Sequence, residues 1–186
     1  AAESGCIALN LGMESGNREV LRQVKKPGTV ETFLKAAEVL RKFDQIHCSV
    51  LLMVGFPGET MSMIFDTINV SREMDLDWHR VSPLQPLPNT PIYDSMVAQG
   101  LIQDVGSKDL RFMGGAYGTQ AEIERGQHLT SPNFEDAFSS IPLTAIPNSE
   151  QITDIWFYMN YHLNFHRLFS EERPVKIQQQ FDHRRV

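Results

Sequence analysis

A short polar segment, residues 12–16, carries the first side chains whose types suit ligand binding. Gly12, Glu14, Ser15 and Gly16 follow directly after an apolar run. The Glu14 carboxylate can accept hydrogen bonds from an amine or a ribose, and the Ser15 hydroxyl can bind a carboxylate. The two glycines allow a ligand to approach the backbone closely. The simpler interpretation is a strand-to-helix turn in which Ser15 or Asn17 caps the helix.

A second segment with the composition of a ligand-binding turn, residues 55–60, follows the next apolar run. Its Pro57-Gly58 pair fits the centre of a type II turn, because proline fixes φ and glycine supplies a positive φ. Thr60 is typical of a helix N-cap, as is Thr29 before the preceding helix. Backbone N–H groups at this helix start could cradle a nucleotide, or the segment is simply a tight turn. A third, proline-rich loop spans residues 85–91.

The elements that must position these segments alternate between strands and helices. Strands are expected at residues 6–11, 47–54 and 78–84, and helices at 17–26, 30–43 and 60–75. This alternation predicts an α/β fold with a parallel sheet and right-handed crossovers. Ligands in such folds bind beyond the carboxyl ends of the strands, which is where the three segments lie. Three strands cannot close a barrel, so the sheet is open or belongs to a larger barrel.

Changes in composition and hydrophobic pattern divide the chain into three parts. Residues 1–100 form the α/β part, 101–148 an irregular variable segment, and 149–186 a long helix with a charged tail. Pro91 predicts a helix over residues 91–100. Asn148 with Gln151 resembles a capping box that opens a helix reaching about Phe169. Gly5 is typical of a helix stop, so residues 1–4 are expected to be the last turn of a longer helix; a processed or tag-derived terminus is the alternative.

Composition narrows the function classes. The 186 residues carry a net charge of −6, which argues against a general nucleic-acid or membrane-surface role. No apolar run is long enough to span a bilayer, and no signal peptide is visible, so a cytoplasmic location is expected. The two cysteines, Cys6 and Cys48, are expected to be small buried residues. They exclude both a disulfide framework and a metal cluster built from this chain's cysteines alone.

Taken together, the three segments resemble a known family. The motifs are Gly12-x-Glu14-Ser15-Gly16, Gly55-x-Pro57-Gly58-Glu59-Thr60 and Pro86-Leu-Pro-Asn-Thr-Pro-Ile-Tyr93. In order and spacing they resemble the C-terminal half of the radical S-adenosylmethionine (SAM) enzymes. The resemblance covers roughly residues 1–100 and is strongest to the branch that often carries an upstream cobalamin-binding domain.

This resemblance implies a fold, an activity and cofactors. The fold is the C-terminal half of a partial (βα)6 TIM-like barrel, followed by a mainly helical C-terminal extension. The activity is that of an iron–sulfur oxidoreductase, which reductively cleaves SAM to a 5′-deoxyadenosyl radical that modifies an unknown substrate. The implied cofactors are SAM and a [4Fe–4S] cluster, with cobalamin as a further possibility in the whole protein.

The resemblance also implies which residues hold the cofactor. Glu14 and Ser15 match positions that contact the amino acid or ribose part of SAM, and the strand segment 53–55 matches the one that lies against the adenine. The predicted cofactor-binding residues are Gly12, Glu14, Ser15, Gly16, Met53, Val54 and Gly55. No residue of this chain is assigned a catalytic or metal-ligating role.

The sequence departs from the family pattern in three places. The CxxxCxxC cluster motif is absent, so the cluster ligands are expected outside this chain and the chain alone is expected to be inactive. In the strand pattern G-x-I-x-G-x-x-E, Leu51 replaces the first glycine and Glu59 lies one residue late. Asn89 replaces the common glycine of the proline-rich loop, which is tolerable because asparagine also visits the left-handed region.

Other interpretations remain open on sequence grounds. A non-catalytic nucleotide-binding or partner-docking α/β module is the first alternative. A metal-dependent hydrolase is the second, because His162 and His166 lie one helical turn apart. The basic helix face of residues 18–26 is expected to be solvated, although one of its cations could pair with a cofactor carboxylate. The first strand is expected to be an unpaired edge that the chain covers by self-association or distortion.

Overall fold

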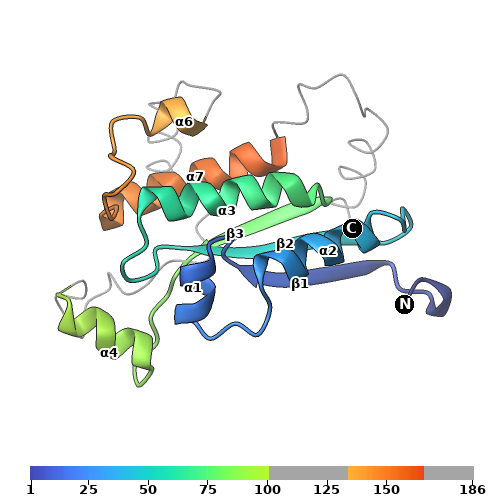
Figure 1. The fold of residues 1–186 in the computed structure, drawn as a ribbon, viewed down its shortest axis with the longest axis horizontal. Helices are drawn as coiled ribbons and strands as arrows, with labels where there is room; N and C mark the ends of the chain where they lie inside the picture. Colours follow the sequence, from blue (N-terminus) through green and yellow to red (C-terminus); the bar gives the residue numbers. More distant parts are fainter. Residues whose placement is uncertain (101–133, 166–186) are drawn as a thin grey trace, which may run out of the picture.

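The computed structural model describes residues 1–100 and 134–165 (Figure 1). The expected irregular segment before residue 134 and the charged tail lie outside the described residues. The elements, in chain order, are a 3₁₀ turn Ala2–Ser4, β1 Ala8–Glu14, α1 Arg18–Gln23, α2 Val30–Leu40, β2 His47–Val54, α3 Met61–Met74, β3 Trp78–Pro83, α4 Pro91–Ala98, α6 Phe134–Ala137 and α7 Ser149–Phe165.

The three strands form a parallel sheet in the order β1-β2-β3, which confirms the predicted α/β fold. The bounds of β2 agree with the prediction, but those of β1 do not. The strand begins at Ala8 rather than residue 6 and continues to Glu14 rather than ending at residue 11. Gly12 does not break it, because the ladder continues through a bulge: Gly12 pairs with Leu51 and Glu14 with Leu52, so that Met13 is the extra residue.

Each strand directs alternate side chains into the core. In β2 the buried residues are Cys48, Val50, Leu52 and Val54, and each residue between them is only half-buried. These buried side chains join the hydrophobic cores of α2, α3 and α7 in one cluster. Figure 1 shows α3 and α7 running side by side over the sheet. The sheet therefore has one face packed against helices and an opposite face, called here the open face, that the described helices leave less covered.

The helix ends follow the capping residues read from the sequence. Thr29 and Thr60 accept hydrogen bonds from the backbone N–H groups of Thr32 and Met63. Asn148 and Gln151 exchange reciprocal side-chain-to-backbone hydrogen bonds of 2.9 Å, which confirms the capping box. Several helices are shorter than predicted, because their last expected residues form turns: α1 ends at Gln23 and α2 at Leu40.

Helix α7 covers the outer edge of β3 with two asparagine side chains. Asn160 accepts from the Val81 N–H (3.1 Å) and donates to the Val81 carbonyl (3.0 Å). One helical turn later, Asn164 makes the same pair of bonds with His79, each at 2.7 Å. In a parallel sheet, alternate residues of an edge strand point their N–H and C=O groups away from the neighbouring strand. The two amides satisfy these groups as a further strand would, which closes this edge of the sheet.

We predict that this pairing is a major local stabiliser. Asn164→Ala leaves a buried N–H and a buried C=O of His79 without partners, which should lower the free energy of unfolding by roughly 2–3 kcal/mol. Urea denaturation followed by circular dichroism measures the effect. Gln99→Ala, which removes an exposed amide at the end of α4, serves as the control and should change stability by less than about 0.5 kcal/mol.

Candidate functional site

Glu14 ends β1 with an ion pair on the open face of the sheet. Its backbone is left-handed, with φ of 71°, and its Oε1 lies 3.0 Å from the Lys26 Nζ. The side chains are 27% and 26% exposed, so the pair is half-buried and still reachable from solvent. A Cβ added at Gly12 would lie 3.3 Å from Glu14 Oε1 and 3.4 Å from Lys26 Nζ. The ion pair therefore packs closely over Gly12, where a residue with a side chain would crowd it.

Ser15 and Gly16 lie on the opposite side of this turn, against α3. The Ser15 side chain is fully buried, and its hydroxyl lies 3.1 Å from the Thr67 hydroxyl and accepts from the Asn17 N–H. The Gly16 N–H donates to the same Thr67 oxygen at 3.0 Å. A Cβ at Gly16 would stand 2.7 Å from the Thr67 Cα, which no side chain can occupy. Asn17 is the N-cap of α1, as the simpler sequence interpretation expected.

The end of β2 divides the other three predicted cofactor residues in the same way. Met53 lies on the open face and is half-buried, whereas Val54 points into the helix-packed core and is buried. Gly55 has φ of 92°, and a Cβ there would lie 3.2 Å from the Ile152 side chain of α7. Of the seven predicted residues, the structure therefore brings Gly12, Glu14 and Met53 to the open face and uses the others in turns and packing.

Glu59 holds the loop that follows β2. Its side chain is only 2% exposed, and its Oε2 accepts from the N–H groups of Gly55 (2.7 Å) and Phe56 (3.1 Å). Its Oε1 is buried and has no hydrogen-bond partner among the described residues. Burial disfavours the charged form and outweighs these two hydrogen bonds, so the pKa of Glu59 is raised to about 7. In the sequence, Glu59 appears only as a motif residue that lies one position late. Its hydrogen bonds to the backbone of the loop are found only in the structure.

The start of α3 has little capacity left for a phosphate. The Glu59 N–H donates to the Phe56 carbonyl at 2.9 Å, and Gly58 has φ of 77°, which confirms the type II turn. The Met61 N–H donates to the Ala145 carbonyl, and the Ser62 N–H to the Leu143 carbonyl. Because these N–H groups of α3 already donate to the segment before α7, the described structure gives no support to a nucleotide cradle here.

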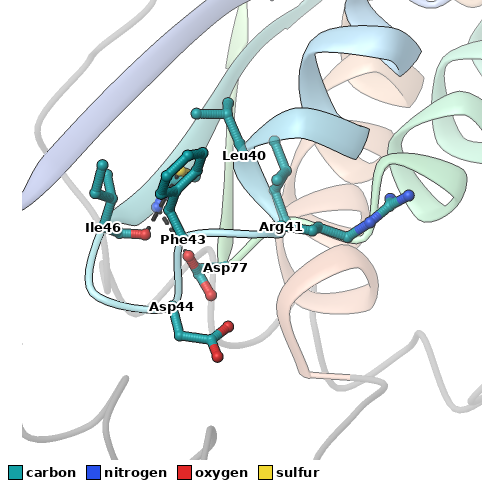
Figure 2. A pocket seen from close by; sticks show the side chains of 8 residues that line it. Leu40, Arg41, Phe43, Asp44, Ile46 and Asp77 are labelled. Carbon is teal, nitrogen blue, oxygen red and sulfur yellow. Dashed lines mark hydrogen bonds between the residues drawn. The ribbon is translucent and has the colours of Figure 1, made fainter. Parts of the chain in front are cut away.

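The opposite, amino-terminal end of the strands holds a small hollow. It is lined by residues of the α2–β2 connection and by Asp77, and Figure 2 shows these side chains around it. Its volume of about 10 Å³ suits at most one water molecule. Asp77 accepts from the Cys48 N–H at 2.8 Å, and the Cys48 thiol is buried as expected, whereas Cys6 is partly exposed. Within residues 1–100 and 134–165, this end of the sheet is packed, and its hollow is too small for a cofactor.

His162 lies in an aromatic cluster on α7. Its ring stacks on Tyr158, and its Nε2 contacts the Arg72 guanidinium. His166, the partner suggested by the sequence, lies outside the described residues. Among residues 1–100 and 134–165, no group of three or more histidine, cysteine or carboxylate side chains is arranged to hold a metal ion. No helix in these ranges is both long enough and apolar enough to cross a membrane.

The described residues form an α/β fold with a parallel sheet, and the carboxyl ends of its strands carry an acid–base pair beside Gly12 and the apolar Met53. Open α/β folds in general bind ligands at this edge. Residues 1–70 match the family model of the Radical SAM superfamily. The match assigns residues 1–70 of the chain to this superfamily.

Curated relatives agree over about half of the chain. An uncharacterized methyltransferase of Pyrococcus horikoshii is 27% identical over 100 residues, which are 54% of this chain and 22% of that protein. The tRNA-2-methylthio-N(6)-dimethylallyladenosine synthase of Nitratiruptor is 34% identical over 90 residues, 48% of this chain and 21% of that enzyme. The chain thus spans about a fifth of the length of these relatives.

Among solved structures, coproporphyrinogen III oxidase of Escherichia coli, a radical SAM enzyme, aligns with a TM-score of 0.49 and 17% identity over 84% of this chain and 26% of that chain.

We predict that Glu59 makes stability fall as pH rises. Its pKa of about 7 in the folded chain exceeds the 4.5 of a free glutamate, so the folded state binds the proton more tightly than the unfolded state. This contribution to stability is complete below pH 4.5 and is lost as pH rises through 7, by a total on the order of 3 kcal/mol. Urea denaturation at pH 5 and pH 8 should show the loss in the native chain and a smaller one in Glu59→Gln. Equal losses in the two proteins would contradict the assignment.

Proposed function

We propose that this chain forms the part of a radical SAM enzyme that binds the methionine and adenosine portions of SAM at the carboxyl ends of β1 and β2. Together with a reduced [4Fe–4S] cluster, SAM bound at this edge would supply the radical chemistry that removes a hydrogen atom from a substrate. The chain's own residues bind and orient the cofactor. The superfamily match over residues 1–70 and the open-face placement of Gly12, Glu14 and Met53 support this proposal.

The observation that carries the proposal is the Glu14–Lys26 pair beside Gly12. The methionine part of SAM bears an ammonium and a carboxylate on the same carbon. A carboxylate and an ammonium 3.0 Å apart, half-buried and packed beside Gly12, present the complementary charges. In this arrangement Glu14 accepts from the cofactor's ammonium and Lys26 donates to its carboxylate. Lys26 would thus be the cation of segment 18–26 that pairs with a cofactor carboxylate.

The remaining predicted residues fit a supporting role. Ser15 and Gly16 fix the turn that carries Glu14, because both form hydrogen bonds with the Thr67 hydroxyl. Glu59 holds the N–H groups of Gly55 and Phe56, and so fixes the end of the strand that offers Met53. An adenine lies flat against apolar side chains and glycine, and Met53 provides such a surface on the open face.

This chain's own residues do not fit the cluster. Three cysteine thiolates are needed when the fourth iron is left to SAM, and the chain has two cysteines. We propose that the cluster ligands come from outside these residues, in a longer protein of which this chain is a part. Cobalamin stays a prediction, because none of the described residues bears on it. The partner-docking interpretation would replace this proposal if the full-length protein lacked a CxxxCxxC motif.

We predict that removing either charge weakens SAM binding. Glu14→Gln and Lys26→Gln, made in the full-length protein with its reconstituted cluster, should each raise the SAM dissociation constant roughly 10- to 100-fold, since each removes a charge-assisted hydrogen bond. Anaerobic calorimetry measures binding, and the yield of 5′-deoxyadenosine measures cleavage. Glu31→Gln removes a carboxylate from an exposed ion pair with Arg18 and should change neither. Unchanged binding in Glu14→Gln would refute the site.

We also propose that the free edge of β1 associates with another strand. Within the described residues β1 has only β2 as a neighbour, while the outer edge of β3 is closed by α7. A free edge presents unpaired N–H and C=O groups to a partner strand. We therefore predict that the 186-residue chain self-associates in analytical ultracentrifugation. Proline substitution at Asn10, which lies within β1, should reduce the association. A monomer with a slowly exchanging, ordered β1 would contradict this.

A further inference from the structure

The open face of the sheet carries polar side chains at regular positions. On the helix-packed face, the strands present apolar residues almost throughout. The residues between them belong to the open face, and the register aligns them across the sheet: Asn10 with Ser49 and Trp78, Gly12 with Leu51 and Arg80, and Met53 with Ser82. The central row of this face has Arg80 at one end, and its other end, at Gly12, borders the Glu14–Lys26 ion pair.

Arg80 stands at one end of that central row. It is exposed between His79 and Val81, which are both buried, so its side chain belongs to the open face. Its Cα pairs in register with Leu51, which pairs in turn with Gly12. The Glu14–Lys26 ion pair borders Gly12, at the other end of the row. Two strand spacings, about 10 Å, separate β1 from β3.

Arg80 differs from the other arginines of residues 1–100 in having no partner among the described residues. Arg18 and Arg22 pair with glutamates, Arg41 donates to the carbonyls of Glu73 and Met74, and Arg72 contacts His162. Glu14 and Lys26 neutralise each other, so Arg80 leaves a net positive charge on this row of a chain whose overall charge is −6. A guanidinium is a planar fork that fits carboxylate and phosphate oxygens. Because Arg80 lies in the middle of β3, the sheet holds its Cα rigidly.

We propose that Arg80 binds an anionic group, a carboxylate or a phosphate, of the substrate. Cofactor and substrate then occupy the two ends of one row: the amino acid part of SAM lies over Gly12 at Glu14 and Lys26, and the substrate anion is held at Arg80, with Leu51 between them. Ser49 and Ser82 lie on the same face and offer hydroxyl groups to the oxygens of the anion. This assignment of a substrate class rests on the function proposed above, but the anion site itself is tested without the cofactor.

The test follows the Nε–H signal of Arg80 by nuclear magnetic resonance in the 186-residue chain. The chain is titrated with inorganic phosphate and, separately, with acetate, at constant ionic strength. A saturable shift of this signal, and of the amide signals of Ser49 and Ser82, is expected for at least one anion, and the anion that binds more tightly identifies the group. Arg80→Lys should weaken binding several-fold and Arg80→Gln about tenfold, because the first loses the fork and the second also the charge. Circular dichroism verifies that both variants fold.

Arg18→Gln is the matched control and should leave anion binding unchanged, because Arg18 is an exposed arginine paired with Glu31. Linear, non-saturating shifts that are equal at Arg80 and Arg18 would overturn the proposal. Failure here, combined with weakened SAM binding in Glu14→Gln, would remove the substrate assignment and leave the cofactor site intact. Saturable anion binding at Arg80, combined with unchanged SAM binding in Glu14→Gln, would retain an anion site and reject the proposed function.

Discussion

The close contact between the turn after β1 and helix α3 is the constraint on which the candidate site depends. Gly16 approaches the Thr67 backbone so closely that a single added carbon would lie 2.7 Å from its Cα. The Thr67 hydroxyl lies within hydrogen-bond distance of both the Ser15 hydroxyl and the Gly16 N–H inside the protein, where an unmade bond costs more than in water. These contacts fix the direction in which β1 ends. Glu14 immediately precedes Ser15 and has a left-handed conformation, and these contacts thereby direct it to the open face.

The same constraint explains why adjacent residues of one motif have different roles. A strand alternates its side chains between two faces, and this alternation continues through the bulge at Met13 up to the turn. Met13 and Ser15 are consequently buried, while Gly12 and Glu14 face outward. A motif that reads as one binding segment thus contains residues that contact a ligand and residues that hold them in place.

Much of this architecture was predictable from the sequence, because it rests on local chemistry. The apolar run 47–54, the threonine caps and the Asn148–Gln151 capping box each depend on residues near one another in the chain, and each was predicted correctly. The extent of β1 was not, since a glycine that usually ends a strand is accommodated by pairing with β2. The asparagine pairing of α7 with β3 joins residues about 80 positions apart, and no local pattern reveals it.

The two ends of the sheet differ in how completely their polar groups are satisfied. At the amino-terminal end, Asp77 accepts from Cys48 and the remaining hollow is hardly larger than one water molecule. At the carboxyl end, Glu59 keeps a buried oxygen without a partner among the described residues, and Glu14 in a left-handed conformation meets Lys26 in a half-buried pair. Such costs persist only where the surrounding structure enforces them. The Thr67 contacts hold the turn that follows Glu14, and the Gly55 and Phe56 N–H groups hold Glu59. The packed side of the sheet thereby supports the Glu14–Lys26 pair on the open face, where Arg80 has no partner among the described residues.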